Sequence, residues 1–282
     1  MINDIKKLKT IDHKTKRNIE LEEEELEFLY MINRYLDYEN RQRKGYNKRN
    51  SILSRRDIKE DLARVLNCNK ENIALSLDDF KKEDIYGFFG NATMHGETVP
   101  DEFRHLKLVV GSINFPDLID ASGLENLKVV TLMFSAEKLE KSFGLSGLEY
   151  VYMLMLPNLK EAINLYNLRR IGLEVNLINL KNSKGLENLE GIEGMAYFNS
   201  LEKADSLRKL KHFGHGNFFS LKSTKGLENL RGLDSANFLS LEDSSLLEKA
   251  FSDGYSLSKG DINRCAIFVR KNENSNDKIL RR

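Results

Sequence analysis

The histidines and cysteines are the residues of this sequence whose types could support catalysis or hold a metal ion. His212 and His215 have the spacing H-x-x-H, but residues three apart on a strand face opposite sides, so we do not expect them to share a metal. Cys68 and Cys265 form no C-x-x-C pair, and the stretch LNCNK around Cys68 holds no histidine or acid that would activate a thiol. We therefore expect a non-catalytic protein without a metal site or a cofactor.

A basic segment between residues 41 and 56, RQRKGYNKRNSILSRR, could recognise phosphate groups. It holds no acidic residue and seven basic ones: Arg41, Arg43, Lys44, Lys48, Arg49, Arg55 and Arg56. A run of this kind can bind the nucleic-acid backbone, so a nucleic-acid-associated protein is one possible function. The alternative interpretation is a solvated linker whose charges pair with the glutamates of the nearby stretch IELEEEELEF.

A series of residue pairs could form a protein-binding surface. The pairs recur about every 20 residues, and the members that we assign to the surface are Met133, Met153, Met155, Glu174, Asn176, Met195, Tyr197, His215 and Asn217. They alternate with apolar residues such as Leu154, Val175 and Ala196, so the two sets should lie on opposite faces of strands. Methionine and tyrosine on an otherwise polar sheet are typical of adaptable protein-binding surfaces. In the alternative interpretation, the protein's own N-terminal segment covers this face.

These pairs lie within a sequence repeat. KGLENL occupies residues 184–189 and 225–230, and SGLENL occupies residues 122–127. The last leucine of this motif belongs to a series spaced by 20 or 21 residues, which we call the anchor leucines: Leu106, Leu127, Leu148, Leu168, Leu189, Leu210 and Leu230. Large apolar residues recur three positions before each anchor leucine, three after it, and eleven or twelve after it. The constant spacing predicts stacked rungs of 20 to 21 residues.

A column of small residues predicts a tight corner in every rung. These residues follow each anchor leucine by fourteen or fifteen positions: Ala121, Ser142, Ala162, Ser183, Ala204, Thr224 and Ser244. One rung cannot be stable alone, because ordering about 20 backbones costs roughly 1 to 2 kcal/mol each, whereas burying about six apolar side chains returns roughly 1.5 to 3 kcal/mol each. Stacking must supply the difference. We therefore predict an α/β fold whose main part is a β-solenoid of seven to eight rungs, with a looser first rung at Ile85.

The GLENL turns, each followed by an apolar stretch and then by SL or NL, resemble leucine-rich-repeat solenoids, in particular the short-turn type of the receptor L-domains. The resemblance covers roughly residues 85–250. The sequence departs from the usual pattern, which has an apolar residue two positions after the anchor and an asparagine five positions after it. Arg170, Gly191, His212 and Gly232 occupy the position two after the anchor. The resemblance therefore implies a leucine-rich-repeat-like β-solenoid without the usual asparagine ladder.

Composition divides the chain into three parts. Residues 1–84 form a charged helical segment that caps the solenoid, residues 85–250 form the solenoid, and residues 251–282 form a C-terminal cap strand and a disordered tail. Apolar residues at near-helical spacing predict one helix within residues 19–39 and a second within residues 54–68, with Ser54 as its N-cap. The alternating stretch INRCAIFVRK, residues 262–271, predicts the last strand.

The overall composition indicates the compartment and the class of partner. The sequence has 44 Lys and Arg against 43 Asp and Glu, so no net charge favours nucleic acid or a membrane. The N-terminus is too polar for a secretory signal, no apolar run approaches the roughly 18 residues of a membrane span, and the isolated cysteines fit a reducing cytoplasm. Abundant Lys, Asn and Ile suggest a bacterial or phage origin. We expect a cytoplasmic effector or inhibitor that binds a partner protein and inhibits or recruits it.

Overall fold

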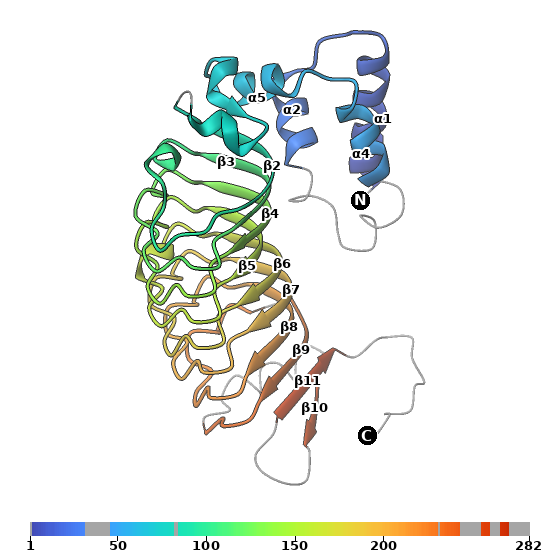
Figure 1. Ribbon diagram of the computed structural model, residues 1–282. Helices are drawn as coiled ribbons and strands as arrows, with labels where there is room; N and C mark the ends of the chain where they lie inside the picture. Colours follow the sequence, from blue (N-terminus) through green and yellow to red (C-terminus); the bar gives the residue numbers. More distant parts are fainter. Residues whose placement is uncertain are drawn as a thin grey trace.

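The computed structural model describes residues 2–31, 46–81, 84–230, 232–242, 255–259 and 266–270. Four α-helices come first in the described chain: α1 (Ile2–Lys16), α2 (Glu23–Tyr30), α4 (Tyr46–Leu53) and α5 (Ile58–Leu66). The strands that follow are β1 (Ile73–Ala74), β2 (Gly87–Thr93), β3 (Leu108–Asn114), β4 (Val129–Ser135), β5 (Tyr150–Met155), β6 (Arg170–Asn176), β7 (Gly191–Tyr197), β8 (His212–Phe218), β9 (Gly232–Phe238), β10 (Tyr255–Lys259) and β11 (Ala266–Arg270). Figure 1 shows the strands along one side of a long stack and the helices at its N-terminal end.

The strands form a parallel β-solenoid of about seven turns. Strands β1 to β9 are neighbours in chain order and pair in parallel, with pairs such as Val109–Val130 and Val130–Val151 in register at a spacing of 21 residues. The looser first rung is also present, because β2 pairs with β3 and Ile85 and Phe88 are buried. The predicted solenoid is therefore confirmed.

The anchor leucines form a continuous interior spine. Those from Leu106 to Leu210 are fully buried in one core cluster, and Leu230 packs partly buried against it. The apolar positions three before the anchors are buried as well, as are those three after the anchors from Val109 to Phe213. Phe198, Phe218 and Phe238 stack in successive rungs with ring centroids 5.5 Å apart. Each rung therefore contributes the same side chains to the same place in the core, which is why the sequence must repeat.

The predicted tight corner explains the glycine of the GLENL motif. Gly185 and Gly226 have φ of 99° and 98°, a left-handed conformation that side chains disfavour. A Cβ on either glycine would lie 1.9 Å from the carbonyl oxygen of Ala162 or Ala204, the small residue of the preceding rung. Successive backbones therefore meet at this corner, and only glycine can occupy the position.

The glutamate and the asparagine of the motif are hydrogen-bonded within and between rungs. The Glu187 carboxylate accepts a hydrogen bond of 2.9 Å from the Gly185 amide, which holds the turn. The Asn188 side-chain amide donates to the Tyr166 carbonyl at 2.6 Å, and Asn229 donates to the Arg208 carbonyl at 2.7 Å. Asparagine thus bonds to the preceding rung from the position one before the anchors, at Asn126, Asn167, Asn188 and Asn229, and Gly147 and Lys209 interrupt this series. The expectation followed only the usual position and overlooked this one.

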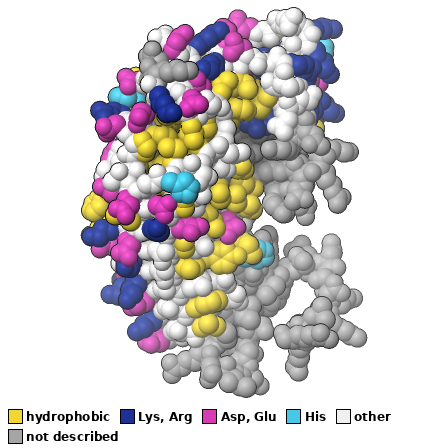
Figure 2. Space-filling view, in the orientation of Figure 1, with side chains coloured by type: hydrophobic (Ala, Val, Ile, Leu, Met, Phe, Trp, Pro, Cys, Tyr) yellow, Lys and Arg dark blue, Asp and Glu magenta, His cyan; other side chains and the backbone are white. Residues whose placement is uncertain are grey.

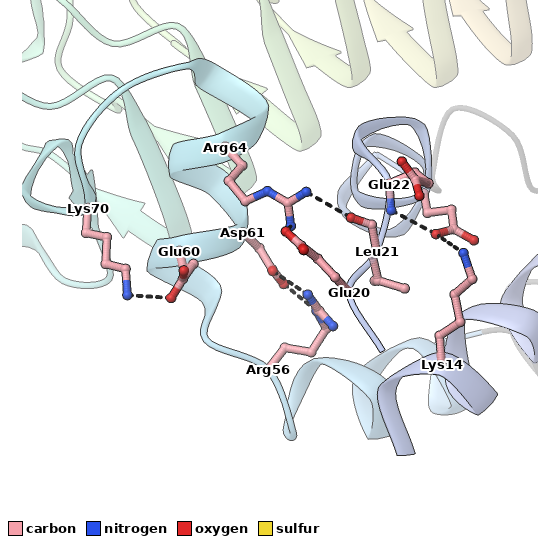
Figure 3. A network of polar contacts seen from close by, with 10 residues as sticks. Lys14, Glu20, Leu21, Glu22, Arg56, Glu60, Asp61, Arg64 and Lys70 are labelled. Atoms are coloured by element: carbon pink, nitrogen blue, oxygen red, sulfur yellow. Dashed lines mark hydrogen bonds and ion pairs between the residues drawn. The ribbon is translucent and has the colours of Figure 1, made fainter. Parts of the chain in front are cut away.

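Polar contacts join the helices to one another, and Figure 3 shows some of them. The acidic run forms the first turn of α2, where Glu22 is the N-cap and the Glu25 carboxylate accepts from the Glu22 amide at 2.9 Å. Arg64 on α5 donates to the Leu21 carbonyl at 2.9 Å and pairs with Glu20. These contacts join α5 to the start of α2.

The helix boundaries correct two sequence-based expectations. Asp57, not Ser54, is the N-cap of α5, because the Asp57 carboxylate accepts from the Glu60 amide at 3.1 Å. Ser54 instead closes the turn after α4, and its hydroxyl donates to the Ser51 carbonyl. Helices α1 and α4 were not predicted, because both are so polar that their few buried residues, such as Leu8 and Ile11 in α1, give no clear helical pattern.

The C-terminal strands close the sheet differently from the repeats. The predicted last strand is confirmed as β11, which pairs with β9 in antiparallel orientation, and β10 pairs antiparallel to β11 at the outside. The predicted disordered tail, Cys265 and Ser244 lie outside the described residues. Among the helices of the described chain, none is both long and apolar enough to cross a membrane.

Candidate protein-binding face

The predicted surface pairs form two rows that run across the sheet. The first outward row places Met133, Met153, Glu174, Met195 and His215 side by side on β4 to β8. The second outward row, at the ends of the same strands, consists of Ser135, Met155, Asn176, Tyr197 and Asn217. Neighbouring members of a row lie on strands about 4.8 Å apart, so each row forms a continuous strip.

The residues between the two rows point into the core, as the alternation predicted. Phe134, Leu154, Val175 and Ala196 are essentially fully buried. The outward residues are half-buried or exposed, apart from Ser135, which is buried. The side-chain directions inferred from the sequence therefore hold for the nine residues assigned to the surface.

The helices cover one half of this sheet face. One hydrophobic cluster joins the helices to outward residues of β3 to β5: Leu108, Val110, Val129, Tyr150 and Tyr152. Met153 packs at its border as a partly buried member. We call the outward face of β3 to β5 the covered half. Of the nine residues assigned to the surface, Met153 packs against this cluster, so the alternative interpretation, in which the N-terminal segment covers the predicted surface, applies to that residue.

Among the residues that the structure describes, the outward face of β6 to β8 lies beyond the hydrophobic cluster, except for a border contact from Leu173, and we call it the open half. Met195 is 43% exposed there, and His215 is also exposed. The Tyr197 hydroxyl contacts the Met195 sulfur at 3.2 Å, and the Asn237 side chain donates to that of Asn217 at 2.8 Å. In Figure 2, hydrophobic side chains reach the surface along the strands below the helices, with acidic side chains beside them.

A charged cluster borders the open half at the start of β6 to β8. Glu193 accepts from Arg170 at 2.8 Å and lies 3.1 Å from the His212 ring. The contacts with His212 and Arg170 lower the pKa of the Glu193 carboxyl below its usual range. These charges therefore satisfy one another and form a paired rim rather than a reactive centre.

The two histidines of the H-x-x-H motif face the same side of the sheet, which corrects the expectation. His212 is in register with Gly191, and His215 with Met195. Phe213, which follows His212, and Gly216, which follows His215, both point into the core. The strand is irregular near Gly214, where the register to β7 shifts, so the simple period of two fails. Among the described residues, no group of three or more His, Cys, Asp or Glu side chains could hold a metal ion.

The described members of the basic segment are engaged within the protein. Arg49 is buried and donates to the carbonyls of Leu29 and Tyr30 at the end of α2. Arg56 pairs with buried Asp61, as Figure 3 shows. Arg55 and Lys48 both contact Asp12 on α1. Arg41, Arg43 and Lys44 lie outside the described residues.

The four described basic residues therefore have a structural role. They join α4 and the turn before α5 to α1, α2 and α5. The interpretation as a simple linker does not fit these residues, because α4 lies within the segment and Arg49 stabilises the C-terminal end of α2. Their acidic partners, Asp12 and Asp61, lie outside the glutamate run that the sequence suggested.

Sequence reasoning missed the apolar outward residues of the covered half. Leu108, Val129 and Tyr150 occupy the position two after the anchor leucines, and the same column continues as Arg170, Gly191 and His212. The change from apolar to polar in this column marks where the helices stop covering the sheet. Comparison of the chain with protein-family models, with curated proteins and with solved structures gives no match.

Proposed function

We propose that this protein is a non-catalytic interaction protein that binds a partner protein through the open half of the solenoid face. The observation that carries the proposal is the continuity of the first outward row. The row touches the helical cluster at Met153 and continues across β6 to Met195, which is 43% exposed. Thioether side chains adapt to different surfaces, which suits a protein-binding site.

The covered half supports the proposal because it shows what this sheet face can bind. Helical surface of the same chain packs there against Tyr150 and Tyr152 and excludes water. A partner that presents a similar apolar surface finds methionine and tyrosine in the open half, with the paired charges of Arg170 and Glu193 at the rim. Binding through apolar anchors inside a polar rim is typical of specific protein interfaces.

We infer that the protein acts by occupying the partner's surface, either to inhibit the partner or to recruit it. The scaffold is a leucine-rich-repeat-like solenoid in this proposal, on the basis of the GLENL repeats and the small corner residues. The isolated cysteines support a cytoplasmic effector or inhibitor. The abundance of Lys, Asn and Ile, which have AT-rich codons, supports a bacterial or phage origin.

The test compares two surface substitutions of matched chemistry. Met195→Asp places a charge in the open half, and Phe143→Asp places one at a 51% exposed position on the turn side of the solenoid. Proteins captured by the full chain from a bacterial lysate are compared for the wild type and both variants. We expect Met195→Asp to lose the captured partner and Phe143→Asp to retain it. Equal recovery with the wild type and Met195→Asp would show that the open half is not the binding face.

A further inference from the structure

Glu174 is the charged residue in the middle of the first outward row. It is half-buried, and the register places it between Met153 on β5 and Met195 on β7. Tyr197 lies next to Met195 on β7, where its hydroxyl contacts the Met195 sulfur. The Glu174 carboxylate therefore lies on a surface of thioether and aromatic groups.

The other glutamates near this face have ionic partners. Glu149 pairs with Lys128, Glu190 with Lys211, and Glu193 with Arg170 and His212. Glu174 forms no ion pair with any residue in the part of the chain that the structure describes. It is thus the uncompensated charge of the described face.

A partner that covers Met195 must also remove water from Glu174, because the two residues are neighbours in one row. Removing water from an unpaired carboxylate is strongly unfavourable unless hydrogen-bond donors replace the water, and a cationic group replaces it best. A negatively charged or purely apolar partner surface would be rejected at this point. The face therefore selects a partner that brings a positive charge to Glu174.

We propose that the partner inserts an arginine or lysine side chain into the open half, with its cationic group on Glu174. This inference rests on the proposed function, because it names the chemistry that the same face recognises. The aliphatic stem would pack along Met195, and the cation would lie near the Tyr197 ring. Arginine fits best, because its planar guanidinium binds a carboxylate through two hydrogen bonds and stacks on aromatic rings.

The experiment uses a random peptide library displayed on phage and selected on the full-length protein. We expect the selected peptides that lose binding to Met195→Ala, which removes the thioether without adding a charge, to be enriched in arginine or lysine at one shared position. One such peptide is then synthesised with its basic residue intact and with that residue replaced by glutamine. Titration calorimetry measures the affinity of both peptides for each protein variant.

A double-mutant cycle identifies the contact. Glu174→Gln keeps the shape of the side chain and removes its charge, and Glu202→Gln makes the same change at an exposed position outside the sheet. We expect Glu174→Gln to weaken the basic peptide about 10-fold or more and to leave the glutamine peptide almost unchanged. Glu202→Gln should change neither affinity. Thermal unfolding of each variant verifies that the fold is intact.

The possible results separate this inference from the proposed function. Peptides that need Met195 but show no basic residue, or that bind Glu174→Gln as tightly as the wild type, would overturn the inference and leave the proposed function standing. A selection that yields no peptide sensitive to Met195→Ala would overturn the proposed function, and the inference with it.

Discussion

The covered and open halves of the sheet face are built from rungs of the same repeat, but different groups lie against their outer surfaces. In the covered half, Tyr150 is 1% exposed beneath the helices, whereas Arg170, its register neighbour on β6, is exposed and paired with Glu193. The inward residues of both halves are equally buried. The difference shows that stacking determines the interior of the solenoid, whereas the use of its outer face depends on what lies against each rung.

The border between the two halves is sharp because the two tyrosines of β5 lie against a glycine, Gly172, on the neighbouring strand β6. A Cβ on Gly172 would lie 2.4 Å from the Tyr150 hydroxyl oxygen and 2.5 Å from a ring carbon of Tyr152. The tyrosines of β5 therefore extend over β6 at Gly172 and end the hydrophobic cover there. Beyond them, the column of Arg170 and His212 carries polar groups that water or a partner can contact.

Replacing Tyr150 by alanine should have the largest effect. The substitution removes a buried ring from the contact between the helices and the sheet, so we expect a loss of about 3 to 5 kcal/mol in the free energy of unfolding. Arg170→Ala, in the same column of the open half, should cost less than about 1 kcal/mol, because it removes an exposed ion pair. Urea unfolding of both variants measures the two values. Similar losses for the two variants would mean that the helices do not cover Tyr150 more than Arg170.

A buried ion pair in the helical region provides a second test of the difference between the two halves. Asp61 is buried, pairs with Arg56, and accepts a hydrogen bond of 2.8 Å from the Tyr30 hydroxyl. Asp61→Ala leaves the guanidinium without its partner, so we expect a loss of about 3 kcal/mol, confined to the helices and the covered half. Hydrogen exchange should show faster exchange there and unchanged protection in β7 and β8. Glu60→Ala, which alters an exposed residue of α5, is the matched control.

Met153 and Met195 lie in the same outward row, and their substitution tests where the border between the halves lies. Met153 packs against the helical cluster, so Met153→Asp should lower the free energy of unfolding by about 1 to 3 kcal/mol. Met195→Asp should change it by less than about 0.5 kcal/mol, because the side chain is 43% exposed. Thermal or urea unfolding distinguishes the two. If Met195→Asp were the more destabilising variant, the assignment of the halves would be wrong.

Acid should weaken the helical region slightly. The hydrogen bond from Arg55, with the lysines nearby, lowers the pKa of Asp12 from 3.8 to about 2. A carboxyl whose pKa is lowered by folding stabilises the folded state above its ordinary pKa, and this contribution is lost as the pH falls from about 4 towards 2. Hydrogen exchange of α1 and α4 between these pH values should show the loss. Asp12→Asn should make the exchange less dependent on pH, and an unchanged dependence would contradict the assignment.

The helical region was harder to predict than the solenoid because its contacts are not periodic. Arg49 and Arg56 look like phosphate ligands in the sequence, and only the fold shows that a helix end and Asp61 bind them. Asp57 and Ser54 are both good N-caps, so the local sequence alone could not select between them. The irregularity near Gly214, which turns His212 and His215 to the same side, also depends on pairing with β7.

The sequence by itself determined the solenoid, its register and the direction of each outward row. The physical reason is that identical rungs must place like residues in contact, so the repeat of the anchor leucines and corner residues admits one stacking arrangement. The tertiary structure alone decided which part of the outward face remains open. Cover depends on contacts between segments far apart in the chain, such as Leu29 of α2 and Tyr150 of β5 in one cluster, and no local pattern specifies such a meeting.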